Sequence, residues 1–263
     1  MPPVSQPDLY IIGLGVSIPG HVTVQATRAM SRCARLYSIV QEPPQMWLPK
    51  EKWGMKVINA LTMYEEGSVR TQNYERAART IIAALDNARP LGYVTYGNPM
   101  AYDRVAQNLI EYAKESGITL QVVPGISSFD TILCDLRVEM APAIQVYDAS
   151  WLVIFGMAPN VNVPALLIQV SVFGSFRTHY SQRQDGRSLE GLVEYLTRFY
   201  PPSHMVSLVR STGQEGEPAN VRKVALGKLS EVTAEDLGGA SLYIPVLNYP
   251  KPDEEMISAM EQK

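Results

Sequence analysis

The stretch LYIIGLGVSIPGHVTV, residues 9–24, decides the fold class. It opens with a short apolar run, residues 9–14, of the length and composition typical of a buried strand. Gly13 and Gly15 then provide a turn, and from residue 22 to residue 33 the apolar positions recur at helical spacing. A strand, a glycine turn and a helix in this order predict the first unit of an α/β sheet.

The same alternation continues up to residue 125. Apolar runs predict strands, and segments with helical spacing lie between them. We expect an N-terminal α/β lobe, residues 1–125, whose sheet is mostly parallel. Its further strands are predicted at 34–40, 55–60, 91–99 and 119–123, and its further helices at 73–88 and 105–116.

Beyond residue 125 the pattern changes to strand-like runs with few long helices. We expect a C-terminal α/β lobe, residues 126–263, with a mixed or antiparallel sheet. Two lobes predict a ligand cleft between them. Strands are predicted at 144–155, 164–174, 204–212, 221–229 and 238–245, and helices at 127–136, 188–199 and the acidic tail 251–263.

Composition excludes several classes of protein. The chain has 263 residues and a formal net charge of −3, so it lacks the basic field that nucleic acid would require. No apolar run approaches about 18 residues, so no membrane span is predicted. Cys33 and Cys134 show neither disulfide-framework nor zinc-ligand spacing, so we predict a cytoplasmic protein without a metal.

The glycine turn has two interpretations. Gly13 and Gly15 after a strand are typical of a dinucleotide site, with Glu42 available for a ribose, but the third glycine is replaced by Ile18. The alternative is a tight turn after a buried strand. The usual motifs of phosphate loops, serine hydrolases and zinc proteases are absent from the sequence.

The segment YEEGSVRTQNY, residues 64–74, gathers phenols around an arginine. Arg70 and Tyr74 are four residues apart and would share one face of a helix, with Tyr64 in the preceding loop. Tyr96 ends a predicted strand, at the carboxyl edge where parallel sheets bind ligands. An arginine beside a phenol lowers its pKa from about 10, which would give a general base without histidine. Packing and capping are the alternative roles for these tyrosines.

In this order the motifs resemble the tetrapyrrole methylase superfamily. The resemblance is carried by YIIGLGVSIPGHVT (10–23), by the long stretch that runs from VTYGNP to SSFDTIL (94–133) and by GGASLYIP (238–245). It implies a methyltransferase with two α/β lobes, which uses S-adenosylmethionine in the cleft between them and needs no metal.

Within that superfamily the chain is most similar to the borosin peptide-backbone N-methyltransferases. The specific matches are residues 64–74, Tyr96 in YGNP, and the YDAS tetrad 147–150 before Trp151. The resemblance implies α-N-methylation of backbone amides in a ribosomally made precursor peptide. The sequence ends at MEQK without the apolar substrate tail that some borosin enzymes carry, so we expect the peptide in trans. A homodimer is also implied.

The resemblance also assigns roles to individual residues. The chemistry of an amide acceptor requires a base, which any of the three tyrosines could supply; our hypothesis is that Tyr74, assisted by Arg70, removes the amide proton, while Tyr64 and Tyr96 orient the carbonyl and the cofactor. Where borosin enzymes commonly have YGHPG, this chain has Asn98 and Met100 in place of the histidine and the last glycine. The implied contacts to S-adenosylmethionine are Gly13, Gly15, Tyr96, Asn98, Met100, Tyr102, Ser127, Ser128, Gln169, Ala240 and Ser241.

Other functions stay open at this point. A tetrapyrrole or another small molecule could be the methyl acceptor on the same fold, and the chain could be a non-catalytic module that binds S-adenosylmethionine or peptide. A ribosomal RNA methyltransferase is disfavoured by the acidic charge. Residues 41–52 are a candidate lid or dimer arm. Between residues 42 and 63, Trp47, Trp53 and several methionines are either exposed interface residues or buried residues. Residues 177–187 are either a surface loop or part of a leader-binding site.

Overall fold

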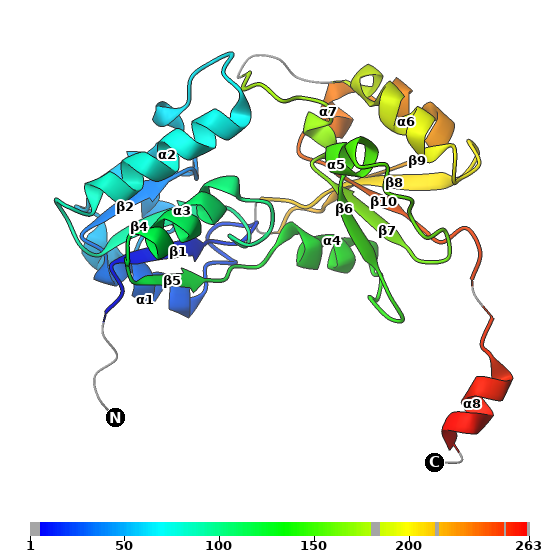
Figure 1. Ribbon diagram of the computed structural model, residues 1–263, viewed down its shortest axis with the longest axis horizontal. Coiled ribbons are helices and arrows are strands. Elements are labelled where there is room, and N and C mark those ends of the chain that lie inside the picture. The colour runs from blue at the N-terminus through cyan, green and yellow to red at the C-terminus, as the bar shows by residue number, and fades with distance from the viewer. Residues whose placement is uncertain (1–5, 180–184, 214–215, 250, 262–263) are drawn as a thin grey trace. The chain divides into compact units, whose positions relative to one another are not determined.

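The computed structural model describes residues 6–179, 185–213, 216–249 and 251–261, which form two compact units (Figure 1). Unit 1 comprises Met1–Val138 with two later segments, Ser175–Gln182 and Ser211–Ala219. Unit 2 comprises Glu139–Gly174, Arg183–Arg210 and Asn220–Lys263. The first unit therefore continues beyond residue 125 and takes up chain from the second half of the sequence.

Unit 1 contains a five-stranded parallel sheet in the order β3-β2-β4-β1-β5. The parallel α/β sheet predicted for the N-terminal half is confirmed. The central strands β1 and β4 are fully buried. Their continuous apolar runs suit strands that are covered by helices on both faces of the sheet. The strands are β1 (Leu9–Gly13), β2 (Arg35–Ser38), β3 (Val57–Asn59), β4 (Leu91–Thr95) and β5 (Leu120–Val123).

Helices α1, α2 and α3 of unit 1 cover the two faces of this sheet (Figure 1). One core cluster packs α1 against the sheet through Met30, and the other packs α2 and α3 through Ile81 and Leu109. Side chains that accept backbone N–H groups begin α1, α3 and α4, at Thr23, Asp103 and Ser127. The helices are α1 (Val24–Arg32), α2 (Arg70–Ala84), α3 (Arg104–Glu115) and α4 (Ser128–Leu136).

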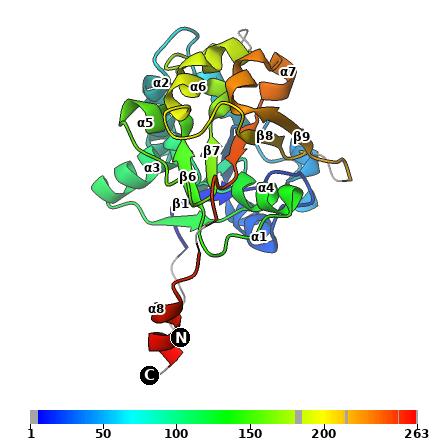
Figure 2. The same ribbon diagram turned by 90° about the vertical axis from the view of Figure 1, so that its right-hand side faces the viewer.

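Unit 2 contains a mixed sheet in the order β6-β7-β10-β8-β9 (Figure 2). Only β6 and β7 pair in parallel, and the other neighbours are antiparallel, as predicted for the C-terminal half. One cluster of buried residues joins this sheet to α5, α6 and α7. The strands are β6 (Gln145–Asp148), β7 (Ala165–Ile168), β8 (Met205–Arg210), β9 (Asn220–Ala225) and β10 (Ser241–Ile244).

The remaining elements are short. Helices α5 (Ala149–Ile154), α6 (Glu190–Leu196), α7 (Ala234–Leu237) and α8 (Glu254–Glu261) belong to unit 2. Single 3-10 turns are η1 (Pro44–Met46), η2 (Lys50–Lys52), η3 (Ala60–Met63), η4 (Val170–Val172), η5 (Gly186–Leu189) and η6 (Leu226–Glu231). Within the described ranges, no helix has both the length and the apolar character needed to cross a bilayer.

Three predicted strands of the C-terminal half are wrong in their second halves. The run 164–174 is a strand only as far as Ile168 and the run 221–229 only as far as Ala225, and the 3-10 helices η4 and η6 follow. The apolar run 144–155 forms β6 only as far as Asp148, and α5 follows directly. The Asp148 carboxylate accepts the backbone N–H groups of Ser150 at 2.8 Å and Trp151 at 3.0 Å, which caps the helix. A capping aspartate inside an apolar run therefore marks a helix start that hydrophobicity alone does not reveal.

Candidate functional site

Three turns meet at the carboxyl edge of the sheet in unit 1. A Cβ atom added at Gly13, which ends β1, would lie 2.4 Å from the Gly97 carbonyl oxygen and 2.8 Å from the Gly125 nitrogen. Gly15 and Gly97 exchange backbone hydrogen bonds, with N–O distances of 3.2 and 2.9 Å. Close contact between the turns after β1, β4 and β5 thus explains these glycines, in agreement with the tight-turn interpretation.

Exposed apolar side chains surround these turns. Tyr96, Met100 and Tyr102 follow β4, and Ile126 follows β5, all with large exposed surfaces. The Asn98 side-chain oxygen accepts the Met100 N–H at 2.9 Å and shapes the turn. Tyr102 has a φ of 65°, a left-handed conformation that costs energy for a tyrosine. Strained and exposed aromatic residues at a strand edge are typical of a ligand-binding rim.

Ser127 and Ser128 lie at the start of α4, on the same edge. The Ser127 hydroxyl donates to the Asp130 carboxylate at 2.7 Å within a capping box, so this hydroxyl is already engaged. The Ser128 side chain is exposed. Of these two predicted cofactor contacts, the Ser128 side chain is accessible to a ligand, whereas the Ser127 hydroxyl caps the helix.

Three predicted cofactor contacts belong to unit 2. Gln169 directly follows β7 and Ala240 directly precedes β10, so they lie at the same end of two antiparallel neighbours. The Gln169 backbone is left-handed, with a φ of 58°. The side chains of Ala240 and Ser241 are buried. Any contact that Ala240 and Ser241 make with a ligand would therefore use mainly their backbone atoms.

Tyr64, Arg70 and Tyr74 form one cluster at the start of α2. The Arg70 Nε–H donates to the Tyr74 hydroxyl oxygen at 2.9 Å, as the spacing of four residues predicts. The Tyr64 and Tyr74 rings pack edge to face, with centroids 5.7 Å apart. All three side chains are partly buried. The structure brings together three of the four predicted catalytic residues.

The fourth predicted catalytic residue, Tyr96, makes its hydroxyl contacts outside this cluster. It donates to the Glu42 carboxylate at 2.6 Å and accepts the Gln41 N–H at 2.8 Å. Burial, with a further contribution from the Glu42 carboxylate, raises the pKa of Tyr96 to about 12. Trp47 is buried, and its indole N–H donates to the Glu42 carbonyl at 3.0 Å, which anchors this loop.

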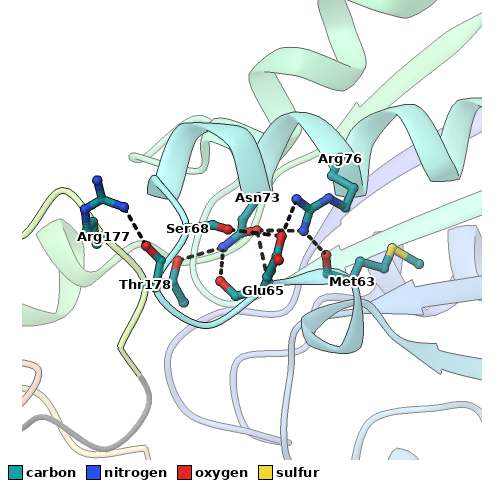
Figure 3. Close-up of polar contacts among 8 residues, drawn as sticks. Met63, Glu65, Ser68, Asn73, Arg76, Arg177 and Thr178 are labelled. Carbon is teal, nitrogen blue, oxygen red and sulfur yellow. Dashed lines mark hydrogen bonds and ion pairs between the residues drawn. The ribbon is translucent and has the colours of Figure 1, made fainter.

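Sequence reasoning missed a polar network behind the cluster (Figure 3). Asn73 is fully buried on α2, where its side-chain amide binds both backbone groups of Glu65 and the hydroxyl of Thr178. The sequence did contain a signal for this buried amide, because Asn73 lies on the same helical face as the apolar residues Ala77 and Ile81. No pattern in the sequence indicated Thr178 as its partner.

The network includes a two-stranded contact between residues 67–70 and 175–178. Gly67 N–H donates to the Thr178 carbonyl at 2.9 Å, and Arg70 N–H donates to the Phe176 carbonyl at 2.9 Å. Residues 177–179 lie on the surface, partly or largely exposed, yet they are fixed to the start of α2. The predicted surface loop is described only there and at 185–187, since residues 180–184 lie outside the described part of the chain.

The rim in unit 1 presents exposed aromatic and apolar side chains. The exposed rings of Tyr96 and Tyr102 suit an adenine, and the exposed Met100 and Ile126 suit its apolar edges. In the described ranges, no group of three or more His, Cys, Asp or Glu side chains could hold a metal ion. The cluster and the rim offer phenols, a guanidinium and apolar surface.

Residues 8–229 match the sequence profile of the tetrapyrrole (corrin/porphyrin) methylases. Two curated relatives are fungal. The chain is 25% identical over 243 residues to the methyltransferase/ribosomally synthesized cyclic peptide dendrothelin A precursor of Dendrothele bispora, covering 90% of this chain and 57% of that protein. It is 23% identical over 249 residues to a methyltransferase/ribosomally synthesized type II borosin cyclic peptide precursor of Phlebiopsis gigantea, covering 92% and 43%.

Two solved structures share the fold. Uroporphyrin-III-C-methyltransferase from Thermus thermophilus superimposes with a TM-score of 0.62 at 18% identity, covering 94% of this chain and 99% of that one. A uroporphyrin-III C-methyl transferase from the same organism, complexed with S-adenyl homocysteine, gives a TM-score of 0.53 at 14% identity, covering 90% and 91%.

Proposed function

Because the chain belongs to the tetrapyrrole (corrin/porphyrin) methylase family, we propose that it methylates backbone amide nitrogens of a peptide, with S-adenosylmethionine as methyl donor. The predicted family and its methyltransferase character are confirmed by the profile match and by the methyltransferases among its relatives. The chain spans 57% of the first relative's length. The peptide acceptor is therefore the proposed part of this assignment.

The observation that carries the proposal is the hydrogen bond from Arg70 to the Tyr74 hydroxyl. A peptide nitrogen is a poor nucleophile because its lone pair is delocalised into the carbonyl. It must lose its proton before it can attack a methyl group. A guanidinium that donates to a phenol oxygen stabilises negative charge on that oxygen, which is what a phenol needs in order to accept such a proton.

The residues of the cluster divide the work as follows. When bound, S-adenosylmethionine supplies an electrophilic methyl group, and its sulfur keeps the electron pair of the broken carbon–sulfur bond. Tyr74 acts as its phenolate: it takes the proton from the amide nitrogen and becomes the neutral phenol, and the nitrogen electron pair forms the new carbon–nitrogen bond. Tyr64 and the remaining N–H groups of Arg70 stabilise charge on the carbonyl oxygen, a contribution of about 3 kcal/mol for a single donor.

Tyr96 is assigned to orientation rather than to proton transfer. Burial and the Glu42 carboxylate raise the pKa of Tyr96 to about 12, so its phenolate is less accessible near neutral pH than that of an ordinary tyrosine. Its exposed ring lies at the rim with Asn98, Met100 and Tyr102, so we propose that it positions the cofactor. Gly13, Gly15, Ser127, Ser128, Gln169, Ala240 and Ser241 remain predicted cofactor contacts.

The partners are proposed on the same basis. Two relatives bear the names of cyclic peptide precursors, which supports a peptide acceptor. We propose that the peptide can be supplied as a separate chain and that the protein is a cytoplasmic homodimer. Light scattering over a range of protein concentrations tests the dimer.

Mass spectrometry tests the proposed function directly. The protein is incubated with methyl-labelled S-adenosylmethionine and with peptides encoded beside its gene, and backbone fragments are searched for the added methyl group. Label on amide nitrogens in the wild-type reaction, and its loss in Tyr74→Phe, is the expected result. Label only on side chains, or none with any peptide, would overturn the peptide assignment.

A tetrapyrrole acceptor is the second candidate, because a uroporphyrin methyltransferase shares the fold over 94% of the chain. Methylation at a reactive ring carbon needs no deprotonated amide. Transfer to a tetrapyrrole that is unaffected by Tyr74→Phe would therefore favour this candidate over the peptide.

A further inference from the structure

Asn73 lies between the two members of the Arg70–Tyr74 pair in the sequence and is one of the buried residues of α2. A buried amide is destabilising unless its donors and acceptors are all satisfied. Asn73 meets this requirement. Its oxygen accepts from Glu65 N–H at 3.0 Å and Arg76 Nη1 at 3.1 Å, and its nitrogen donates to the Glu65 carbonyl at 3.0 Å and the Thr178 hydroxyl at 2.9 Å.

The orientation of this amide is fixed by its partners. Glu65 presents a backbone N–H, which is only a donor, and a backbone carbonyl, which is only an acceptor. The Asn73 oxygen must face the first and its nitrogen the second. Since Glu65 follows Tyr64 in the chain, the amide holds the loop that carries the Tyr64 ring against Tyr74.

The same amide reaches the segment that contacts Arg70. Thr178 accepts the remaining Asn73 N–H, and the segment 175–178 then accepts from Arg70 twice. The Phe176 carbonyl binds the Arg70 backbone N–H at 2.9 Å, and the Ser175 carbonyl lies 3.4 Å from Arg70 Nη1. A shift of this segment would move the guanidinium that donates to Tyr74.

From this geometry we infer that Asn73 and Thr178 are positioning residues for methyl transfer. They act through Tyr64 and Arg70 and touch neither acceptor nor cofactor. The inference rests on the proposed function for its kinetic consequence. Misplacement of reacting groups by about 1 Å can cost on the order of a hundredfold in rate, so a network that fixes two of three side chains should be visible in kcat.

The test compares Thr178→Val with Thr178→Ser. Valine keeps the shape but removes the hydroxyl that accepts from Asn73, whereas serine keeps the hydroxyl. Thr197→Val in unit 2 is the matched control. Thr197 is also partly buried, and its hydroxyl donates a hydrogen bond to the Glu194 carbonyl at 3.0 Å. Asn73→Asp is a further variant, since a carboxylate cannot donate to the Glu65 carbonyl.

We expect Thr178→Val to lower kcat for peptide methylation by at least about tenfold with little change in the KM for peptide or the Kd for S-adenosylmethionine. Thr178→Ser should restore kcat to within about threefold of wild type, and Thr197→Val should leave it unchanged. A kcat for Thr178→Val within about twofold of wild type, an effect confined to KM, or an equal loss in Thr197→Val would overturn the inference.

A second measurement does not depend on the acceptor. Amide hydrogen exchange in Thr178→Val should rise at residues 64–70 and 175–178 and stay unchanged in β1 and α3. Unchanged exchange in those two segments would overturn the positioning role. If the wild-type protein fails to methylate any peptide, the proposed function fails, and the exchange result alone decides the positioning role.

Discussion

The hydroxyl of Tyr96 donates to the Glu42 carboxylate at 2.6 Å, although 53 residues separate the two in the chain. This contact engages the Tyr96 hydroxyl with an anionic acceptor. It also attaches the loop after β2 to the rim after β4. Tyr74, whose hydroxyl oxygen faces a cationic donor, and Tyr96, whose hydroxyl faces an anion, are therefore suited to different roles.

Glu42→Gln should lower the pKa of Tyr96 from about 12, because the substitution removes a nearby negative charge that disfavours phenolate. Ultraviolet difference titration of Glu42→Gln and wild type, each compared with its Tyr96→Phe counterpart, measures the value. A pKa that stays near 12 would show that burial alone is responsible.

Tyr74→Phe should reduce peptide methylation roughly a hundredfold to ten-thousandfold, the range for losing a general base. Affinity for S-adenosylmethionine should be preserved, since the rim residues are untouched. Tyr112→Phe is the control, because the Tyr112 hydroxyl on α3 donates to the Glu75 carboxylate at 3.3 Å and has no role in the proposed reaction. Single-turnover kinetics and calorimetry measure the two quantities, and full activity in Tyr74→Phe would exclude it as the base.

Gly13→Ala should destabilise the protein by about 2 to 3 kcal/mol, because the new methyl group meets the Gly97 carbonyl at 2.4 Å and cannot be accommodated without moving backbone. Gly54→Ala is the matched control, with no atom within 4 Å of the added carbon. Urea unfolding of both variants measures the free-energy change. Equal stability of the two would contradict the close contact between the turns.

Asp8→Asn should lower stability at neutral pH but not in strong acid. Hydrogen bonds from Thr119 and then Arg89 lower the pKa of Asp8 to about 2. A carboxyl group whose pKa is depressed in the folded state stabilises the protein at pH values above its unfolded-state pKa of about 3.9. This stabilisation is lost as the pH falls through the folded-state pKa of about 2. Urea midpoints of wild type and Asp8→Asn should therefore differ at pH 7 and converge near pH 2. A constant difference across this range would rule out the carboxylate as its source.

Local patterns were sufficient to predict most of the fold. Strands such as β1 and β4 are continuous apolar runs that end in glycine or polar turns, and this pattern identifies them as buried strands. The predicted helix at 73–88 begins earlier, at Arg70, because the Arg70 N–H is bound by Phe176 from a distant part of the chain. Such a cap has no local signal.

The candidate site was predictable only where its parts are close in sequence. The Arg70–Tyr74 contact follows from helical spacing. The pairings of Tyr96 with Glu42 and of Asn73 with Thr178 depend on how distant segments are brought together, which composition and periodicity do not encode. A buried asparagine on an apolar helical face could nevertheless have been singled out as a residue in need of a partner.

The glycine turns have a consequence for engineering. Gly13 and Gly125 each face backbone atoms of a neighbouring turn, so neither tolerates even one extra carbon without rearrangement. Attempts to broaden acceptor choice by randomising that corner would yield mostly misfolded libraries. Gly54, where an added carbon would meet no atom within 4 Å, is a position at which variation can be explored while the scaffold survives.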